Sequence, residues 1–375
     1  MEARSLFAKR LFDKLNDNNY VGVEIELPVI NNNEGHVVDK EIIKELFHKI
    51  KDLGFSYYSY SSDGDVIALK NKSNGDTISL EYSYNTLEIS LSKSLYIRNL
   101  EKRFIEYYKY INKYLKEFNY ELVGTGINPY YRDINKTCIN EKRYKIIEYL
   151  LSNKENKLFG EFCSYIASVQ THVNVNKEDV IKTLNMFTDI EDTKEKLFTN
   201  SYMEELGNIN ARKYLWENSN FLNNAGRNRK YKDLDDLLDD YFERKMFYVA
   251  RDNRFYLVDD YLSVKEFFNK DRVIVRDING IEREVKPLKR DVEDFRSYKS
   301  VELSKYGTLE IRTDCTPEIK KIFSIVAFNV GLTKNRDKVI DYISNNKDIK
   351  KEDLLELAKE GLIMRGCKEE RYLEV

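Results

Sequence analysis

The chain has 375 residues, of which 42% are hydrophobic and 13% aromatic, so it can bury a substantial core and is not a disordered protein. Its 62 basic and 64 acidic side chains leave a net charge of −2, which gives no overall reason to bind nucleic acid or an anionic membrane. No stretch approaches the roughly 18 apolar residues that span a bilayer. We expect a cytoplasmic protein without a nucleic-acid or membrane partner.

The first third of the chain alternates extended segments with helices. Residues 1–14 indicate a charged helix, residues 21–30 a strand, and residues 40–53 a helix that Gly54 ends. Strand-like alternation fills residues 55–92, and Asp63-Gly64 and Asn74-Gly75 are hairpin turn signals within it. This segment therefore predicts antiparallel pairing.

Helices and strands come in clusters in the rest of the chain. Residues 98–118 have apolar side chains at helical spacing, which indicates a core-facing helix. We expect further strands at 121–127, 163–175 and 301–311, and further helices at 177–187, 233–246 and beyond Pro317. Clusters without strict alternation favour an α+β fold on a mainly antiparallel sheet.

No segment suggests a domain boundary or a disulfide framework. The chain has only four prolines and no linker-like tract, so we expect one domain over residues 1–375. Its cysteines are widely spaced without a CxxC pair, which is typical of reduced thiols in a cytosol. They are Cys138, Cys163, Cys315 and Cys367. The oligomeric state is left open.

Acidic residues recur in two of the predicted strand regions. In the run Val21-Gly-Val-Glu-Ile-Glu-Leu27, Glu24 and Glu26 share one strand face, opposite Val23 and Ile25. Glu81 and Glu88 are an odd number of residues apart, so they share a face only if residues 82–85 form a turn or bulge. Solvated surface carboxylates are the alternative for both pairs.

Two later strands carry the other candidate side chains. Gln170, His172, Asn174 and Asn176 share one strand face, and such a set is costly to bury without partners. A hydrogen-bonded sheet histidine is the alternative for His172. Glu310, Arg312 and Asp314 also have the same parity, which fits either a surface ion-pair ladder or a metal-binding acid beside an anion-binding guanidinium.

Together these side chains suit divalent-cation chemistry. Five glutamates and one histidine are hard ligands for more than one Mg²⁺ or Mn²⁺, which could bridge the phosphates of ATP while Arg312 stabilises the transferred group. The chain has neither a GxxxxGK[ST] phosphate loop nor a GxGxxG fingerprint, because Gly124-Thr-Gly126 continues as Ile-Asn-Pro. Any nucleotide would then be held by metals and sheet-borne side chains.

In their order along the chain, these segments resemble the glutamate–cysteine ligase superfamily, in particular its plant-type and bacterial branch. The resembling blocks are Gly22–Glu26, Ser79–Ser90, Gly124–Pro129, Ser168–Asn176, Leu197–Ser201 with Arg212 and Trp216, and Gly307–Arg312. The resemblance implies a glutamine synthetase-like curved antiparallel sheet with helices on its convex side. It also implies that ATP phosphorylates the γ-carboxylate of glutamate before an amine, most commonly cysteine, attacks, as in glutathione biosynthesis.

The resemblance also implies roles for individual residues. Arg312 and Glu310 are the catalytic candidates, Arg212 is the candidate for the α-carboxylate of glutamate, and Gln170 and Asn174 are candidates for binding substrate or nucleotide. The implied metal ligands are Glu24, Glu26, Glu81, Glu88, His172 and Glu310.

The chain also departs from the family pattern. Tyr82-Ser-Tyr-Asn85 replaces a Pro-Gly-Gly turn in the acidic block and adds one residue, and the segment 216–229 aligns poorly with the family's downstream arginine. Three alternatives therefore stay open. They are the same ligase chemistry with another amine, a two-metal phosphoesterase, and a binding protein without catalysis.

Overall fold

The computed structural model describes residues 2–152, 157–252, 254–258, 262–366 and 368–374. Its largest element is a nine-stranded sheet in the order β14-β15-β7-β1-β5-β4-β3-β2, with β6 paired to the end of β1. All neighbouring strands of this sheet are antiparallel, which confirms an α+β fold on a mainly antiparallel sheet. Its strands are β1 (Val21–Asn31), β2 (Phe55–Tyr60), β3 (Val66–Asn71), β4 (Thr77–Leu80), β5 (Thr86–Ser94), β6 (Tyr120–Leu122), β7 (Ser168–Asn174), β14 (Val301–Leu303) and β15 (Thr308–Cys315).

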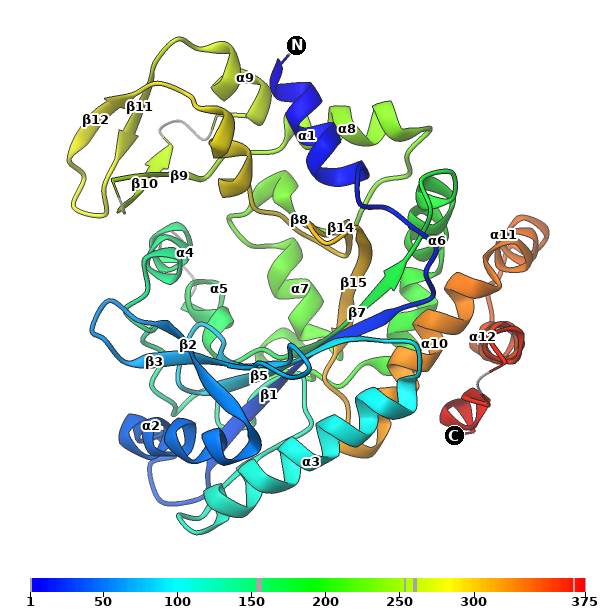
Figure 1. The fold of residues 1–375 in the computed structure, drawn as a ribbon, viewed down its shortest axis with the longest axis horizontal. Helices are drawn as coiled ribbons and strands as arrows, with labels where there is room; N and C mark the ends of the chain where they lie inside the picture. The colour runs from blue at the N-terminus through cyan, green and yellow to red at the C-terminus, as the bar shows by residue number, and fades with distance from the viewer. Residues whose placement is uncertain (1, 153–156, 253, 259–261, 367, 375) are drawn as a thin grey trace.

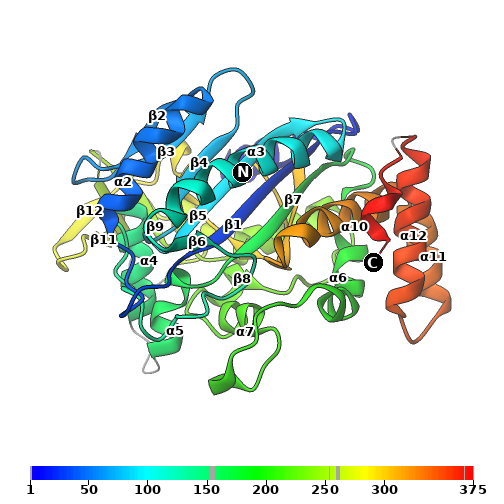
Figure 2. The same ribbon diagram turned by 90° about the horizontal axis from the view of Figure 1, so that it is seen from below.

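Long helices pack against one face of this sheet. Helix α3 contacts β5, α10 contacts β7, and α6 contacts β15. Figures 1 and 2 show α2, α3 and α10 on this side, whereas α4, α5 and α7 lie on the other. The helices named are α2 (Lys40–Lys49), α3 (Ile97–Lys116), α4 (Lys142–Ser152), α5 (Lys157–Glu161), α6 (Val180–Phe198), α7 (Ala211–Glu217) and α10 (Ile322–Lys334). No helix in the described part of the chain is long and apolar enough to cross a membrane.

The alternation in β1 explains why one face of the sheet is apolar and the other polar. Val21, Val23, Ile25 and Leu27 are at most 1% exposed and belong to the main hydrophobic core. Because successive side chains on a strand point to opposite faces, Glu24 and Glu26 lie on the face away from α3 and α10. The core thus orients the acidic side chains.

The turn signals of the first third are confirmed. Gly64 and Gly75 have φ of 84° and 82°, a left-handed conformation that favours glycine, and they lie in the β2–β3 and β3–β4 connections. Gly54, with φ of 84°, follows the short 3₁₀ turn Ile50–Leu53 that ends α2.

Several predicted boundaries are wrong. The strand expected at 121–127 is only β6, the run 163–175 begins as a 3₁₀ turn before β7, and 301–311 is the hairpin of β14 and β15. The helix expected at 177–187 continues as α6 to Phe198, because the helix packs on β15 and α11 (Arg336–Asn345). Tertiary contacts override the weak local propensity of its threonines and aspartates.

A second sheet lies outside the predicted elements. Its strands run in the order β12-β11-β10-β9, beside α1 (Glu2–Phe12) and α8 (Leu234–Glu243) in Figure 1. These strands are only four or five residues long, so each gives little alternation to recognise. They are β9 (Tyr248–Arg251), β10 (Arg254–Val258), β11 (Val273–Arg276) and β12 (Glu282–Val285).

Several further elements complete the fold. They are β8 (Ala225–Gly226) paired with β13 (Tyr298–Lys299), α9 (Val264–Asn269), α11, and α12 (Lys351–Met364), which packs on α10. Among the described cysteines, Cys138, Cys163 and Cys315 are free thiols. Cys367 lies outside the described residues.

Candidate functional site

The strand register brings most of the predicted site residues to neighbouring positions on one sheet face. Glu26 lies opposite Glu88 across the β1–β5 pair, and Glu24 lies opposite Gln170 across the β1–β7 pair. On the next strand along, Glu310 lies opposite His172. Side chains directly opposite each other in an antiparallel pair share a face, so residues far apart in sequence converge here.

The β4–β5 hairpin resolves the odd spacing of Glu81 and Glu88. Ser79 pairs with Glu88, and the Glu81 amide donates to the Thr86 carbonyl at 3.0 Å, so Glu81 lies opposite Thr86. Tyr82, at the start of the turn, has φ of 61°. The expected turn over 82–85 therefore exists, and it puts both carboxylates on the same side of the sheet.

Glu24, His172 and Glu310 form a compact cluster. One ligand atom from each lies within 4.8 Å of the other two, a spacing that small side-chain rotations can close around one cation. His172 Nε2 is 3.3 Å from a Glu24 oxygen and lacks a partner with hydrogen-bond geometry. Its Nδ1 is 3.1 Å from the Thr308 hydroxyl, which leaves Nε2 toward the carboxylates.

Both carboxylate oxygens of Glu26 accept hydrogen bonds from residues of β7. One carboxylate oxygen accepts from the Ser168 amide at 2.7 Å, and the other accepts from the Gln170 amide nitrogen at 2.9 Å. Gln170 is only 3% exposed, and its amide oxygen has no hydrogen-bond partner among the described residues. An unsatisfied acceptor beside acidic groups suits a donor or cation brought by a ligand.

Two arginines adjoin these carboxylates. Arg312, on β15, forms an ion pair with Glu310. Arg212, in the first turn of α7, is 6% exposed and donates from one terminal nitrogen to the Arg312 carbonyl at 3.0 Å. Its Nε is buried and has no partner among the described residues, so the guanidinium retains donors for an anionic group.

A cavity of about 470 Å³ opens over this face. Its lining contains most of the predicted site residues, namely Glu24, Glu26, Glu81, Glu88, Gln170, Arg212 and Arg312. His172 and Glu310 do not line it but adjoin it through Glu24 and Arg312. Asn174 is not brought to it, because that side chain lines a separate cavity with Asp179 and Arg336.

Burial and repulsion between neighbouring carboxylates shift the pKa values of the glutamates in the site. Burial, reinforced by the other glutamates, raises the pKa of Glu88 well above its ordinary value and the pKa of Glu81 to about 7. Burial also raises the pKa of Glu26. Burial acts on Glu24 in the same direction, but His172 outweighs it, so the net pKa of Glu24 is lowered. Added positive charge would relieve this repulsion.

The prediction that Asp314 shares a strand face with Glu310 and Arg312 is wrong. The strand is irregular between Ile311 and Asp314, and this shift turns Asp314 to the helix-covered face. There its carboxylate is 2.8 Å from Lys194 Nζ of α6 and accepts from Asn329 of α10 at 3.0 Å. It therefore does not share a face with Glu310 and Arg312.

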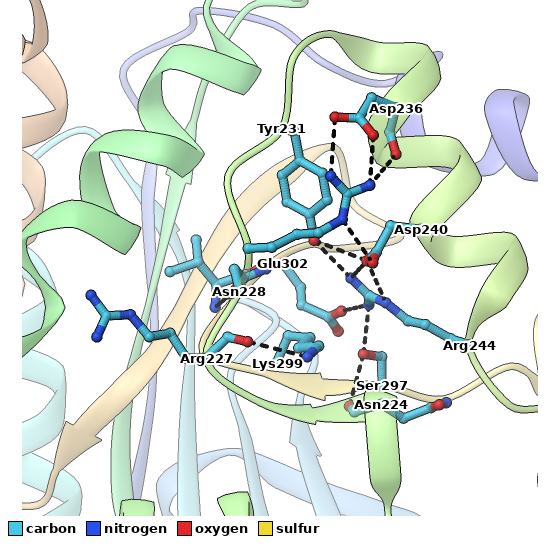
Figure 3. A network of polar contacts seen from close by, with 12 residues as sticks. Asn224, Arg227, Asn228, Tyr231, Asp236, Asp240, Arg244, Ser297, Lys299 and Glu302 are labelled. Carbon is cyan, nitrogen blue, oxygen red and sulfur yellow. Dashed lines mark hydrogen bonds and ion pairs between the residues drawn. The ribbon is translucent and has the colours of Figure 1, made fainter.

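A buried polar network supports the outer edge of the site (Figure 3). Arg244 is 1% exposed and contacts Glu302, which lies opposite Glu310 across the β14–β15 pair. It also donates to Asp240 at 2.7 Å and to the Ser297 hydroxyl at 2.7 Å. Because Ser297 lines the cavity, this network fixes one part of its wall.

Sequence reasoning missed the wall opposite the sheet. Arg143 and Tyr144 of α4 and Arg296, Ser297 and Tyr298 line the cavity. The Tyr144 hydroxyl donates to the Leu80 carbonyl at 3.2 Å, which fixes α4 to the end of β4. These residues lie in helical and irregular segments without alternation or a motif, so no sequence signal marks them.

Gly124-Thr-Gly126 has a packing role. A Cβ on Gly124 would lie 2.3 Å from the Pro317 carbonyl oxygen, and one on Gly126 would lie 2.7 Å from Cys315 Cβ. Such close approaches admit only glycine. The segment packs against the end of β15 and the residues that follow it.

These features define an α+β protein whose antiparallel sheet carries acidic side chains and an imidazole beside a polar cavity. No protein-family model matches the chain, and no curated protein matches it. Among solved structures, the chain is similar to a crystal structure of glutamate–cysteine ligase from Francisella tularensis in complex with AMP. The identity is 10% and the TM-score 0.39, over 97% of this chain and 83% of that one.

Proposed function

We propose that the chain is an ATP- and Mg²⁺-dependent carboxylate–amine ligase that forms an amide bond at the γ-carboxylate of glutamate. The observation that carries this proposal is the convergence of carboxylates from β1, β4–β5 and β15 with His172 beside a cavity that also holds Arg212 and Arg312. This arrangement suits a reaction between two anions, ATP and a carboxylate, whose mutual repulsion must be overcome.

The side chains fit hard divalent cations. Glu24, His172 and Glu310 would hold one Mg²⁺ or Mn²⁺, and Glu26, Glu81 and Glu88 would hold others. When bound, these ions supply positive charge that screens the phosphates of ATP and polarises the phosphate undergoing transfer. Burial and the neighbouring glutamates raise the pKa values of Glu81 and Glu88, so bound cations would favour the charged forms of both carboxylates.

The protein's own groups then bind and orient the substrates. Arg212 offers its free donors to the α-carboxylate of glutamate, because a guanidinium fork matches a carboxylate. Arg312 stabilises the phosphate in transfer. A γ-carboxylate oxygen of glutamate attacks the terminal phosphorus and ADP leaves. The amine then attacks the acyl phosphate carbon, loses a proton, and phosphate leaves.

The proposal extends to the fold and the setting. We infer a sheet curved as in glutamine synthetase with helices on its convex side, and one catalytic domain over residues 1–375. Cysteine is the first acceptor to test, as in glutathione biosynthesis in the cytoplasm, with other amines as alternatives. The chain's departures from the family around 82–85 and 216–229 concern the site, so the acceptor is the part most open to change.

A turnover assay tests the proposal. The purified protein is incubated with ATP, Mg²⁺, glutamate and a panel of amino acids and amines, while phosphate release and product mass are followed. We expect stoichiometric phosphate and a product equal in mass to glutamate plus the amine less water. Absence of product across the panel, or cleavage of a generic phosphodiester without ATP, would contradict it.

A further inference from the structure

The two walls of the cavity differ in their charged side chains. The sheet wall carries four glutamates and Arg312, whereas Arg143 and Arg296 lie among the lining residues contributed by α4 and the segment before β13. Tyr298, which also lines the cavity, has a pKa that burial raises and that both guanidiniums lower, so the two arginines act on the same region.

The guanidinium of Arg143 has no hydrogen-bond acceptor or carboxylate partner among the described residues. Its backbone amide donates to the Glu141 carboxylate at 2.8 Å, which fixes the start of α4. The guanidinium lies over the Tyr144 ring, 4.9 Å from its centroid. Within the described ranges it forms no ion pair and donates no hydrogen bond, so its directional donors remain available to a ligand.

The guanidinium of Arg296 is held by backbone carbonyls. One terminal nitrogen donates to the carbonyls of Glu293 and Phe295 at 2.7 and 2.8 Å, and its own carbonyl accepts from Asn224 at 2.8 Å. The guanidinium has no carboxylate partner in the part of the chain that the structure describes. Nearby Tyr248 has a buried hydroxyl without a partner there.

Two arginines around the site are paired with carboxylates, whereas Arg143 and Arg296, like Arg212, have no ion pair within the described residues. Arg312 contacts Glu310, and Arg244 contacts Glu302 and Asp240. Partly buried guanidiniums without carboxylates are costly unless a ligand supplies the anion. Planar donors on both are suited to phosphate or carboxylate oxygens.

We propose that Arg143 and Arg296 form an anion subsite that binds the phosphate chain or a carboxylate of a substrate across the cavity from the glutamates. This inference rests on the proposed function for its setting. It assigns the wall away from the sheet to substrate recognition, and it leaves the metal-binding role to the sheet.

Binding without turnover tests the subsite. Affinities of inorganic tripolyphosphate with Mg²⁺, and separately of glutamate and of cysteine, are measured by calorimetry for wild type, Arg143→Met and Arg296→Met. Arg272→Met is the matched control, because Arg272 is an exposed arginine just before β11 whose ion pair among the described residues is with exposed Glu284. Melting temperatures without ligand establish that each variant is folded.

We expect both cavity variants to weaken one probe about tenfold or more, and the control to change it less than twofold. Weakened tripolyphosphate identifies the phosphate chain as the anion, and a weakened amino acid identifies a carboxylate. Unchanged affinity for every probe in folded cavity variants would overturn the subsite. Because no turnover is needed, this outcome is independent of whether amide formation is found.

If a variant does not fold, the subsite can still be tested on the wild-type protein by chemical modification of its arginines. Phenylglyoxal modifies accessible arginines, and mass spectrometry locates the modified positions. We expect tripolyphosphate or the bound amino acid to slow modification of Arg143 and Arg296 at least fivefold, but not that of Arg272. Equal modification rates with and without each probe would overturn the proposal.

Discussion

At the scale of single residues, the account depends on Glu24, His172 and Glu310 acting together. They come from three neighbouring strands, and their ligand atoms lie within 4.8 Å of one another. Glu24 is the half-buried member and also lines the cavity, so it connects the cluster to the substrate side.

Glu24→Gln should therefore weaken Mn²⁺ binding by about 100-fold, because it removes a charged ligand while keeping the side-chain shape. Mn²⁺ affinity is measured by electron paramagnetic resonance and turnover by phosphate release. Glu318→Gln is the control, because Glu318 is exposed and its ion pair among the described residues is with exposed Lys320. Equal Mn²⁺ affinity in both variants would remove Glu24 from the metal site.

Arg212→Lys tests the carboxylate role of Arg212. Lysine keeps the charge but loses the planar fork, so KM for glutamate should rise about tenfold or more while KM for ATP changes little. The position is 6% exposed, so the unfolding midpoint in urea is measured alongside the kinetics. A rise confined to KM for ATP would reassign this arginine.

At the scale of elements, one buried ion pair and the hydrogen bonds of Asn329 attach α6 and α10 to the sheet that carries the site. Lys194 of α6 and Asp314 of β15 are 2% and 4% exposed and lie 2.8 Å apart. Asn329 of α10 donates both to Asp314 and to the Thr171 hydroxyl, at 3.0 Å each. This contact joins α6, α10, β7 and β15 directly behind His172 and Glu310.

Lys194→Met should lower the free energy of unfolding by about 3–5 kcal/mol, because it leaves the Asp314 carboxylate buried without its cation. The double variant with Asp314→Asn should recover most of this loss, since no buried charge then remains unpaired. Urea unfolding followed by tryptophan fluorescence measures both. Additive losses in the double variant would show that the two side chains do not interact.

The elements also show what sequence can and cannot predict. The alternation around Glu24 and Glu26 is a local pattern, so their shared face was predictable. The shared face of Glu81 and Glu88 was predicted only on the condition that residues 82–85 form a turn or bulge. The irregularity in β15 that turns Asp314 inward depends on pairing with β7 and has no local signal. Arg143 and Arg296 reach the cavity only because α4 and the segment before β13 are placed by tertiary packing.

At the scale of the molecule, distant segments complete one cavity. Phe7 of α1 packs edge-on against Phe242, Phe268 and Phe295, so the N-terminal helix supports the segment that continues to Arg296 and Tyr298. The C-terminal helices α10 and α12 pack against each other beyond the opposite face of the sheet (Figure 2). Both parts of the chain therefore contribute to the geometry of the site.

Ligand-dependent stability is the corresponding whole-molecule prediction. ATP should raise the melting temperature when Mg²⁺ is present and have little effect with excess chelator, because the glutamates repel phosphates that are not screened by cations. At a concentration 100 times Kd, the stabilisation should be about 2.7 kcal/mol. Differential scanning fluorimetry of wild type and Glu24→Gln measures this, and an equal ATP effect without metal would contradict it.

The most direct test of the central claim is anomalous diffraction from crystals grown with Mn²⁺ and a non-hydrolysable ATP analogue. The account predicts Mn²⁺ peaks at coordination distance from Glu24, His172 and Glu310, with the phosphate chain of the analogue reaching the same ions from the cavity. Mn²⁺ peaks confined to other surfaces, or an analogue bound away from this sheet face, would contradict it.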